Sequence, residues 1–310
     1  ALNFVRNPRY FGSRIGNIQQ VSLLYHANET DTYRSFTAGK LDRAEFLLPQ
    51  LQQKGWKNFE EAGQLHVSPV PFVDAVYFCA DQPPFDNSAL RRAFVLATDR
   101  ETLAREIENQ IPATGGYIPP GLPGHSPGIG LPYDPDQAQR ILAEAGYPGG
   151  KDFPPVNFLL GIVGLEREDT LIFDHLREMW KRNLGIVVQK SELNFEKMKF
   201  EQRQDFQLFF TGWFADYPDP ASFLDTNYTV NECRWSNSEY ETLIEEGRHI
   251  LDQPQRIECY RRADKVLIDS AVILPLFYGH TYELLQPWVR KPSGSSMYSP
   301  PWKDIILTPH

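Results

Sequence analysis

Beyond Pro155 the sequence alternates between short apolar runs and longer amphipathic stretches, and this alternation constrains the fold more than any other feature. It predicts strands over residues 156–161, 186–190 and 206–211, with helices over residues 166–183 and 194–203 between them. A β-α-β-α-β order needs crossover connections, which are right-handed and place helices on the faces of a largely parallel sheet. We therefore expect an α/β fold that binds ligands beyond the carboxyl ends of its strands.

Further helices and strands are predicted on both sides of this region. Asn87, Asp99 and Asp134 each precede an expected helix, where a short polar side chain accepts a hydrogen bond from the backbone. Ser236 and Glu239 have the spacing of a capping box before a helical stretch near the C-terminus. Additional strands are predicted over residues 21–25, 67–72, 74–79 and 271–278.

The composition argues against a membrane-spanning chain and against a nucleic-acid-binding surface. The 310 residues, 41% of them hydrophobic, are enough for two structural units. No apolar run approaches the ~20 residues that a membrane-spanning helix needs. The formal net charge is -9, and the basic residues are not concentrated in any one stretch. Cys79, Cys233 and Cys259 form neither a CxxC motif nor a disulfide framework, so we expect buried thiols.

Residues 211–220 are the strongest candidate for a binding site. They follow the apolar run 206–210 and are expected to form a short loop that presents Asp216 beside Trp213 and Tyr217. A carboxylate between aromatic faces suits a ligand that carries a cation on an extended organic body. A structural interpretation stays open, because both rings could belong to the core and Asp-Pro pairs mark turns.

The sequence lacks the motifs of catalytic, metal and cofactor sites. None of the seven histidines lies three or four residues from another, which is the spacing of a helical metal-binding pair. Gly-rich phosphate loops, a GxSxG elbow and a recognisable nucleophilic cysteine are missing as well. We therefore expect no catalytic residues, no metal and no cofactor. A hydrolase acting on peptides is the weakest alternative.

Several stretches, in order along nearly the whole chain, together resemble the extracellular solute-binding proteins of family 5, which are the peptide, dipeptide and nickel receptors of ABC importers. Each stretch alone is a weak match, whereas the set is specific. They are Arg6-Asn-Pro-Arg-Tyr-Phe-Gly12, Ala38-Gly-Lys-Leu-Asp42, residues 84–100, Ile118-Pro-Pro-Gly-Leu-Pro-Gly124, Tyr133-Asp-Pro135, Ala143-Glu-Ala-Gly-Tyr-Pro-Gly-Gly150, Gly212-Trp-Phe-Ala-Asp-Tyr-Pro-Asp-Pro220 and Ile273-Leu-Pro-Leu276.

This resemblance implies a periplasmic-binding-protein-like α/β fold of the class II, cluster C type. It begins in the middle of the family's architecture, so we expect one complete α/β lobe and part of a second, with a strand-rich region of the family preceding Arg6. Residues 1–75 are expected to form the partial lobe I, a mixed α/β unit. Residues 76–280 are expected to form the ligand-facing lobe II, and residues 281–310 to return to lobe I.

The resemblance also implies a non-catalytic protein whose two lobes close over a ligand by hinge bending. Similar peptide receptors hold the ligand backbone against the segment that matches residues 212–215, and pair the α-amino group with the aspartate that matches Asp216. Main-chain pairing is blind to side chains, while a charge-assisted hydrogen bond fixes one end. The expected ligand-binding residues are Asp216, Trp213, Gly212, Phe214, Ala215 and Tyr217.

Partners and location follow from the same resemblance. It implies a small-molecule or oligopeptide ligand, the membrane subunits of an ABC importer as partners, a monomer, and no bound nucleic acid. The expected location is periplasmic or extracellular, with membrane association through the importer or a lipid anchor. Residues 209–211 lack the basic residue that some oligopeptide binders carry before the tryptophan, so recognition of a ligand carboxylate is not implied. The alternative is a ligand-sensing domain of a cytoplasmic transcriptional or signalling regulator.

Overall fold

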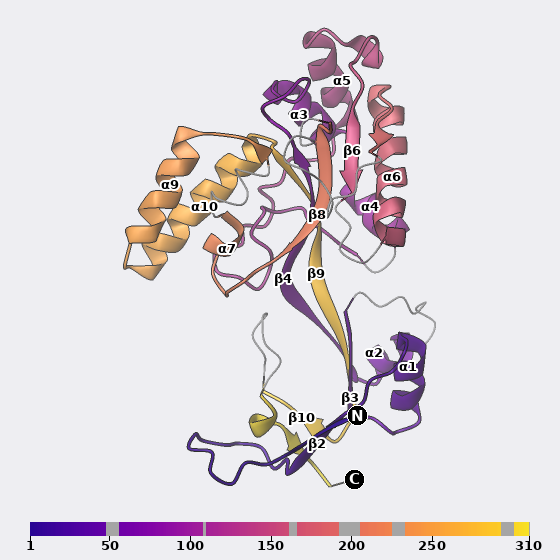
Figure 1. The fold of residues 1–310 in the computed structure, drawn as a ribbon, viewed down its shortest axis with the longest axis vertical. Coiled ribbons are helices and arrows are strands. Elements are labelled where there is room, and N and C mark those ends of the chain that lie inside the picture. The colour runs from indigo at the N-terminus through magenta and orange to yellow at the C-terminus, as the bar shows by residue number, and fades with distance from the viewer. Residues whose placement is uncertain are drawn as a thin grey trace. The chain divides into compact units, whose positions relative to one another are not determined.

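The computed structural model describes residues 1–47, 56–107, 110–160, 166–191, 205–224, 233–292 and 301–309. The chain divides into two compact units, which we call unit 1 (Ala1–Val70 with His280–His310) and unit 2 (Pro71–Gly279). It passes from one unit to the other inside two long strands, β4 (Leu65–Phe78) and β9 (Ile273–Leu285) (Figure 1). The lobe boundaries expected after residues 75 and 280 fall in these same two strands.

β4 is one continuous strand, so the prediction of two separate strands over residues 67–72 and 74–79 was wrong. Pro69 and Pro71 do not interrupt it. The carbonyl of Pro71 accepts the N–H of Ala215, which shows that the odd-numbered residues of β4 direct their backbone groups toward β8. β8 ends at Phe214, opposite Phe72, so Pro69 lies beyond the ladder, whereas Pro71 accepts one bond from Ala215 and, without an N–H, cannot donate one in return.

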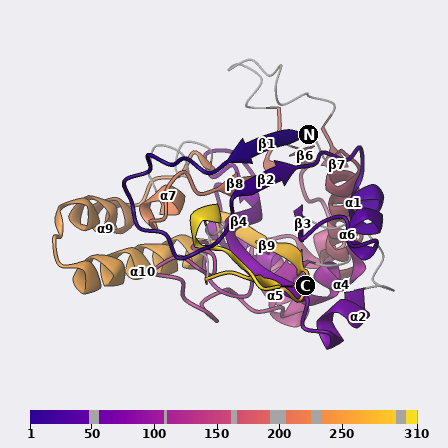
Figure 2. The same ribbon diagram turned by 90° about the horizontal axis from the view of Figure 1, so that it is seen from below.

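The described residues of unit 1 form small antiparallel strand pairs together with helices. Its elements are β1 (Leu2–Val5), β2 (Gln20–Leu23), α1 (Glu29–Thr37), β3 (Arg43–Leu47), α2 (Trp56–Glu61), β10 (Val289–Arg290), the 3-10 helix η4 (Trp302–Asp304) and β11 (Ile306–Leu307). β1 pairs with β2, β10 with β11, and β3 with the end of β9, all antiparallel; Figure 2 shows β1 and β2 side by side. Phe36, Phe46, Trp56 and Leu284 form its main core.

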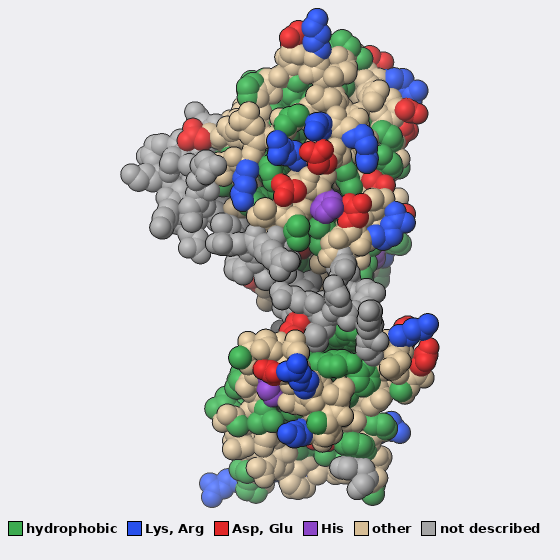
Figure 3. Space-filling model, turned by 90° about the vertical axis from the view of Figure 1, so that its right-hand side faces the viewer, with side chains coloured by type: hydrophobic (Ala, Val, Ile, Leu, Met, Phe, Trp, Pro, Cys, Tyr) green, Lys and Arg blue, Asp and Glu red, His purple; other side chains and the backbone are tan. Residues whose placement is uncertain are grey.

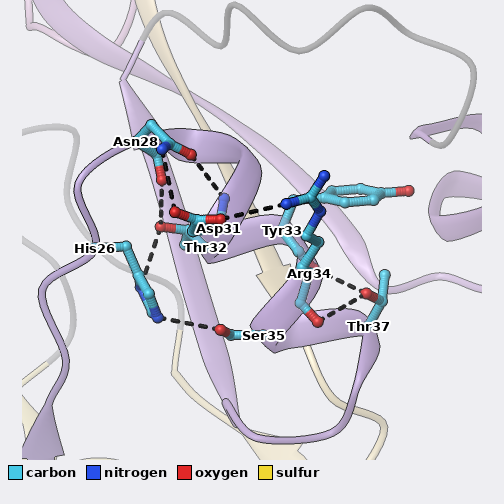
Figure 4. Close-up of polar contacts among 8 residues, drawn as sticks. All are labelled: His26, Asn28, Asp31, Thr32, Tyr33, Arg34, Ser35 and Thr37. Atoms are coloured by element: carbon cyan, nitrogen blue, oxygen red, sulfur yellow. Dashed lines mark hydrogen bonds and ion pairs between the residues drawn. The ribbon is translucent and has the colours of Figure 1, made fainter.

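The start of α1 illustrates how local polar contacts set a helix end in unit 1 (Figure 4). Asn28 is the N-cap residue, and its side chain accepts the N–H of Asp31 at 2.9 Å. The ring of His26 contacts Thr32 Oγ1 at 3.3 Å and Ser35 Oγ at 3.1 Å, one helical turn further on. The Asn28 contact satisfies a backbone N–H that the helix end leaves unpaired, and the His26 contacts link the preceding segment to side chains of the helix.

Unit 2 is built around a mixed sheet. Its further elements are α3 (Ser88–Leu96), α4 (Arg100–Glu106), β5 (Ile111–Pro112), α5 (Pro135–Glu144), η1 (Pro148–Gly150), β6 (Asn157–Leu160), α6 (Glu166–Leu184), β7 (Gln189–Lys190), β8 (Leu208–Phe214), α7 (Ala221–Leu224), α9 (Ser238–His249) and α10 (Gln253–Asp269). The strand order is β9-β4-β8-β6-β7, with β5 beside β9. The helix predicted over residues 194–203 lies outside the described residues.

Only part of this sheet is parallel, so the expectation of a largely parallel sheet was wrong. β6 runs parallel to both β7 and β8. β4 pairs antiparallel with β8, and β5 pairs antiparallel with β9. β4 arrives from unit 1 and lies directly against β8, so it is not joined to β8 by the crossover helix that a parallel neighbour needs.

Helices cover both faces of this sheet (Figure 1). On one face Phe158 of β6 packs against Phe173 and Trp180 of α6, with ring centroids 5.5 and 6.0 Å apart. On the other face Tyr117 packs against Phe223 of α7 at 5.4 Å. The exterior of unit 2 seen in Figure 3 intersperses acidic and basic side chains, which is typical of a solvated helical surface.

The helix starts test the predicted caps directly. Asn87, Asp99 and Asp134 are the N-cap residues of α3, α4 and α5, and each side chain accepts a backbone N–H, so these three predictions are confirmed. The predicted capping box was wrong. Asn237 caps α9 by accepting the N–H of Tyr240, and Ser236 instead donates to the Glu241 side chain.

Candidate functional site

The candidate segment is part of a strand for longer than the sequence suggested. β8 runs from Leu208 to Phe214, so the loop expected from Thr211 begins only at Ala215. The strand is extended by its antiparallel partner, with Phe214 opposite Phe72 and Gly212 opposite Asp74. Cross-strand pairing thus keeps a glycine and two aromatic residues in an extended conformation that local propensity did not indicate.

Over the residues that the structure describes, Gly212 and Phe214 have no strand partner on the side of β8 that faces away from β4, and we call this stretch of backbone the open edge of β8. The N–H of Ala215 donates to the carbonyl of Pro71, so by the alternation of an antiparallel ladder Gly212 and Phe214 direct their N–H and C=O groups away from β4. On that side the partner is β6, whose described residues pair with β8 as far as Phe210. Within the described ranges no strand pairs with Gly212 or Phe214 there.

The side chains around this edge lie on two faces. Trp213 is half-buried, and its indole Nε1 donates to the carbonyl of Ser222 at 2.8 Å, which ties β8 to α7. Phe214 points to the opposite face because side chains alternate along a strand. It is 45% exposed, and its ring lies 6.2 Å from that of Phe72. An exposed aromatic surface therefore adjoins the open edge.

Asp216 follows the strand end directly. Its backbone N–H donates to Ser222 Oγ at 2.9 Å, while its side chain is exposed. In the part of the chain that the structure describes, its carboxylate makes no hydrogen bond or ion pair. Tyr217 is also exposed, and Ala215 is buried. The structure thus brings together the open edge at Gly212 and Phe214 with an exposed carboxylate; the flanking of Asp216 by Trp213 and Tyr217 stays a prediction.

Sequence reasoning missed Asp74, a second carboxylate at this position. A side-chain Cβ at Gly212 would stand 2.7 Å from Asp74 Oδ1 and against the Phe72 ring, so only glycine leaves room for both. Burial, followed by the negative charge of Asp169, raises the pKa of Asp74 to about 7. The sequence feature that could have pointed to Asp74 is that it is the single aspartate inside the apolar run from Val73 to Phe78.

Asp219 has a structural role in the same segment. Its Oδ1 accepts the N–H of Ala221 at 2.9 Å, at the start of α7. Its carboxylate also receives Arg256 Nη1 at 2.6 Å and Nη2 at 2.8 Å. These contacts give Asp219 a structural role at the turn that precedes α7.

The described ranges show neither a metal-binding cluster nor a membrane-spanning helix. They contain no group of three or more His, Cys, Asp or Glu side chains placed to hold a metal ion. None of the helices in these ranges combines the length and the apolar character needed to cross a bilayer. Cys79, Cys233 and Cys259 are buried and form no disulfide with one another, as predicted.

Comparison with known proteins gives the family and the fold of this chain. The family model described as "Bacterial extracellular solute-binding proteins, family 5 Middle" matches residues 1–232. The oligopeptide-binding protein OppA of Bacillus subtilis is 26% identical over 293 residues, which cover 90% of this chain and 53% of that protein. The chain spans about half the length of the curated relatives it matches.

Two solved structures show the same fold. HbpA2 from Haemophilus parasuis matches with a TM-score of 0.83 at 18% identity, over 99% of this chain and 61% of that one. OppA of Haemophilus influenzae, in complex with RPPGFSPFR, matches with a TM-score of 0.66 at 22% identity, over 98% of this chain and 61% of that one. The periplasmic-binding-protein-like α/β fold expected from the sequence is confirmed.

Proposed function

The chain belongs to the bacterial extracellular solute-binding proteins of family 5, and on this premise we propose that it is part of a non-catalytic receptor that binds a peptide or peptide-like solute for an ABC importer. The observation that carries the proposal is the open edge of β8 at Gly212 and Phe214, which ends beside the exposed carboxylate of Asp216. A relative named for oligopeptide binding and a structural neighbour in complex with RPPGFSPFR support it.

An extended peptide satisfies both parts of this site at once. Its backbone adds to the open edge as a further strand, through hydrogen bonds that do not depend on its side chains. Its α-amino group donates to Asp216, and a hydrogen bond between charged groups contributes about 1.5–3 kcal/mol. Trp213, Ala215 and Tyr217 complete the segment that would surround the bound amino end.

The proposal also includes the expected partners and location, which rest on the same family membership. The partners are the membrane subunits of the importer, and the location is periplasmic or extracellular, with association through the importer or a lipid anchor. Hinge closure of two lobes and a monomeric state stay predictions. The alternative of a domain in a cytoplasmic regulator has no support, because the matching relative from Bacillus subtilis is named as a binding protein and the neighbour from Haemophilus influenzae holds a peptide.

The test is calorimetric titration of the full-length protein with di-, tri-, tetra- and pentaalanine, each with a free and with an N-acetylated amino end. Asp216→Asn should weaken binding of a free-amino peptide by about tenfold or more and leave its acetylated form unaffected. Asp205→Asn, which removes the same charge from an exposed site before β8, is the matched control. Equal affinities of wild type and Asp216→Asn for free-amino peptides would remove Asp216 from the site. If the wild type binds none of these alanine peptides, recognition of a peptide through its main chain and amino end alone is ruled out.

A further inference from the structure

The loop that carries Asp216 is fastened at its other end to helix α10. Two nitrogens of Arg256, Nη1 and Nη2, donate to the two carboxylate oxygens of Asp219 at 2.6 and 2.8 Å. The Arg256 and Asp219 side chains are only 16% and 26% exposed. Such a two-point contact fixes orientation as well as distance, which a single-point ion pair does not.

Tyr260 of the same helix contacts the Arg256 side chain and holds it in place. Its guanidinium lies 4.8 Å from the ring centroid of Tyr260, and Nη2 also donates to Tyr260 Oη at 3.4 Å. Tyr260 can stand there because α9 has a glycine at Gly247, where a Cβ would lie 2.9 Å from the tyrosine ring. The hydrogen bonds to Asp219 raise the pKa of Arg256, so the guanidinium stays charged. The loop is therefore anchored to the packed α9–α10 pair.

A short series of contacts leads from this anchor to Asp216. The carbonyl of Asp219 accepts the N–H of Ser222 at 3.1 Å, and Asp219 Oδ1 accepts the N–H of Ala221. Ser222 Oγ in turn accepts the N–H of Asp216, and its carbonyl accepts Trp213 Nε1. Each contact joins groups within nine residues of one another, whereas Arg256 lies 37 residues from Asp219 in sequence. Among the contacts just named, the one between Arg256 and Asp219 therefore joins the residues that are farthest apart in sequence.

We propose that Arg256 is a positioning residue for recognition of the ligand's amino group: acting through Asp219 and Ser222, it holds the Asp216 carboxylate at the end of the open β8 edge. This inference rests on the function proposed above and adds a residue that does not touch the ligand. A free loop would have to be ordered each time a ligand binds, and ordering side chains and backbone at a site weakens affinity. An anchored loop avoids that penalty.

The experiment measures peptide affinity in the full-length protein with the alanine peptide that the wild type binds best. Arg256→Gln should weaken binding of the free-amino peptide by about three- to tenfold and leave binding of the N-acetylated peptide unchanged. In an Asp216→Asn background the Arg256→Gln change should have little further effect, because the two residues act through one contact. Arg256→Lys, which retains one donor toward Asp219, should recover part of the loss.

Arg261→Gln is the matched control. It removes another arginine of α10 whose ion pair is exposed and is made with Glu258 of the same helix, not with the loop. Circular dichroism and thermal unfolding verify that each variant is folded. If Arg256→Gln is not folded, Arg256→Lys replaces it in the affinity measurements. Equal losses for free-amino and N-acetylated peptides, or a full additional loss in the Asp216→Asn background, would overturn the positioning role. A loss in Asp216→Asn with none in Arg256→Gln would overturn it while leaving the proposed function intact.

Discussion

Gly212 meets two requirements at one position of β8. Its backbone groups face the open edge, and its missing side chain leaves room for the Phe72 ring and the Asp74 carboxyl on the neighbouring strand. Phe214, two residues on, presents a ring to solvent on the same face. A glycine with this packing gives the site its shape as well as its free hydrogen-bonding groups.

Gly212→Ala should therefore destabilise unit 2. The added methyl group meets the Phe72 ring and Asp74 Oδ1, and overpacking of this kind costs about 1–3 kcal/mol. Chemical denaturation of the wild type and the variant measures the difference. Combining Gly212→Ala with Phe72→Leu should cost less than the sum of the two single changes, since the smaller side chain relieves the contact. Simple additivity would show that the ring is not the obstacle.

At the scale of elements, the sequence predicted helix starts well and strand ends poorly. Asn87, Asp99 and Asp134 cap helices through contacts within three residues, so the information is local. The extent of β8 is not local, because β4 extends it through Phe214. The same holds for the mixed character of the sheet, which depends on the strand that enters from unit 1.

The residues of the candidate site likewise divide into those that local sequence identifies and those that only tertiary contacts identify. Asp216 was found because its immediate neighbours are distinctive, and the structure leaves its carboxylate exposed. Arg256 was not found, because nothing near it in sequence distinguishes it from the other arginines of α10. Asp74 could have been noticed as a lone acid in an apolar strand, but its closeness to Gly212 depends on register.

The N-cap of α1 provides a test at the same scale (Figure 4). Asn28→Ala removes the acceptor of the Asp31 N–H and should lower the free energy of unfolding by about 1 kcal/mol. Asn28→Ser retains an acceptor and should recover most of that loss. Denaturation curves of both variants and of the wild type measure these differences in the free energy of unfolding. Equal destabilisation by serine and alanine would show that the cap contributes little.

For the whole molecule, two carboxyl groups link folding to pH. Burial raises the pKa of Asp74 to about 7, with a further contribution from Asp169. Burial also raises the pKa of Asp264 to about 7, although its carboxylate accepts the N–H groups of Tyr117 and Ile118, which lower it. Both groups are ordinarily ionised above pH 3.8, so folding keeps protons on them across the interval up to pH 7.

The sign of the effect follows from proton binding. Between pH 3.8 and about 7 the folded state holds more protons than the unfolded state at these groups, so their contribution to stability falls as the pH rises and is constant above pH 7. If a group is completely buried, the free energy of unfolding that it contributes falls by on the order of 4 kcal/mol across this interval. Asp74 is partly exposed, so its contribution changes by less. The protein should lose stability from these groups on the alkaline side of the interval, not on the acid side.

Asp74→Asn isolates one of the two groups, because asparagine resembles the protonated acid and does not titrate. Denaturation should give equal stabilities for the variant and the wild type well below pH 3.8, where Asp74 is neutral in both the folded and the unfolded state. Above pH 7 the variant should be more stable by roughly 1–4 kcal/mol, since it avoids the burial of a charge beside Asp169. The measurement below pH 3.8 is the internal control. A variant that gains nothing as the pH rises, or that loses stability, would show that Asp74 is ionised in the folded protein without penalty.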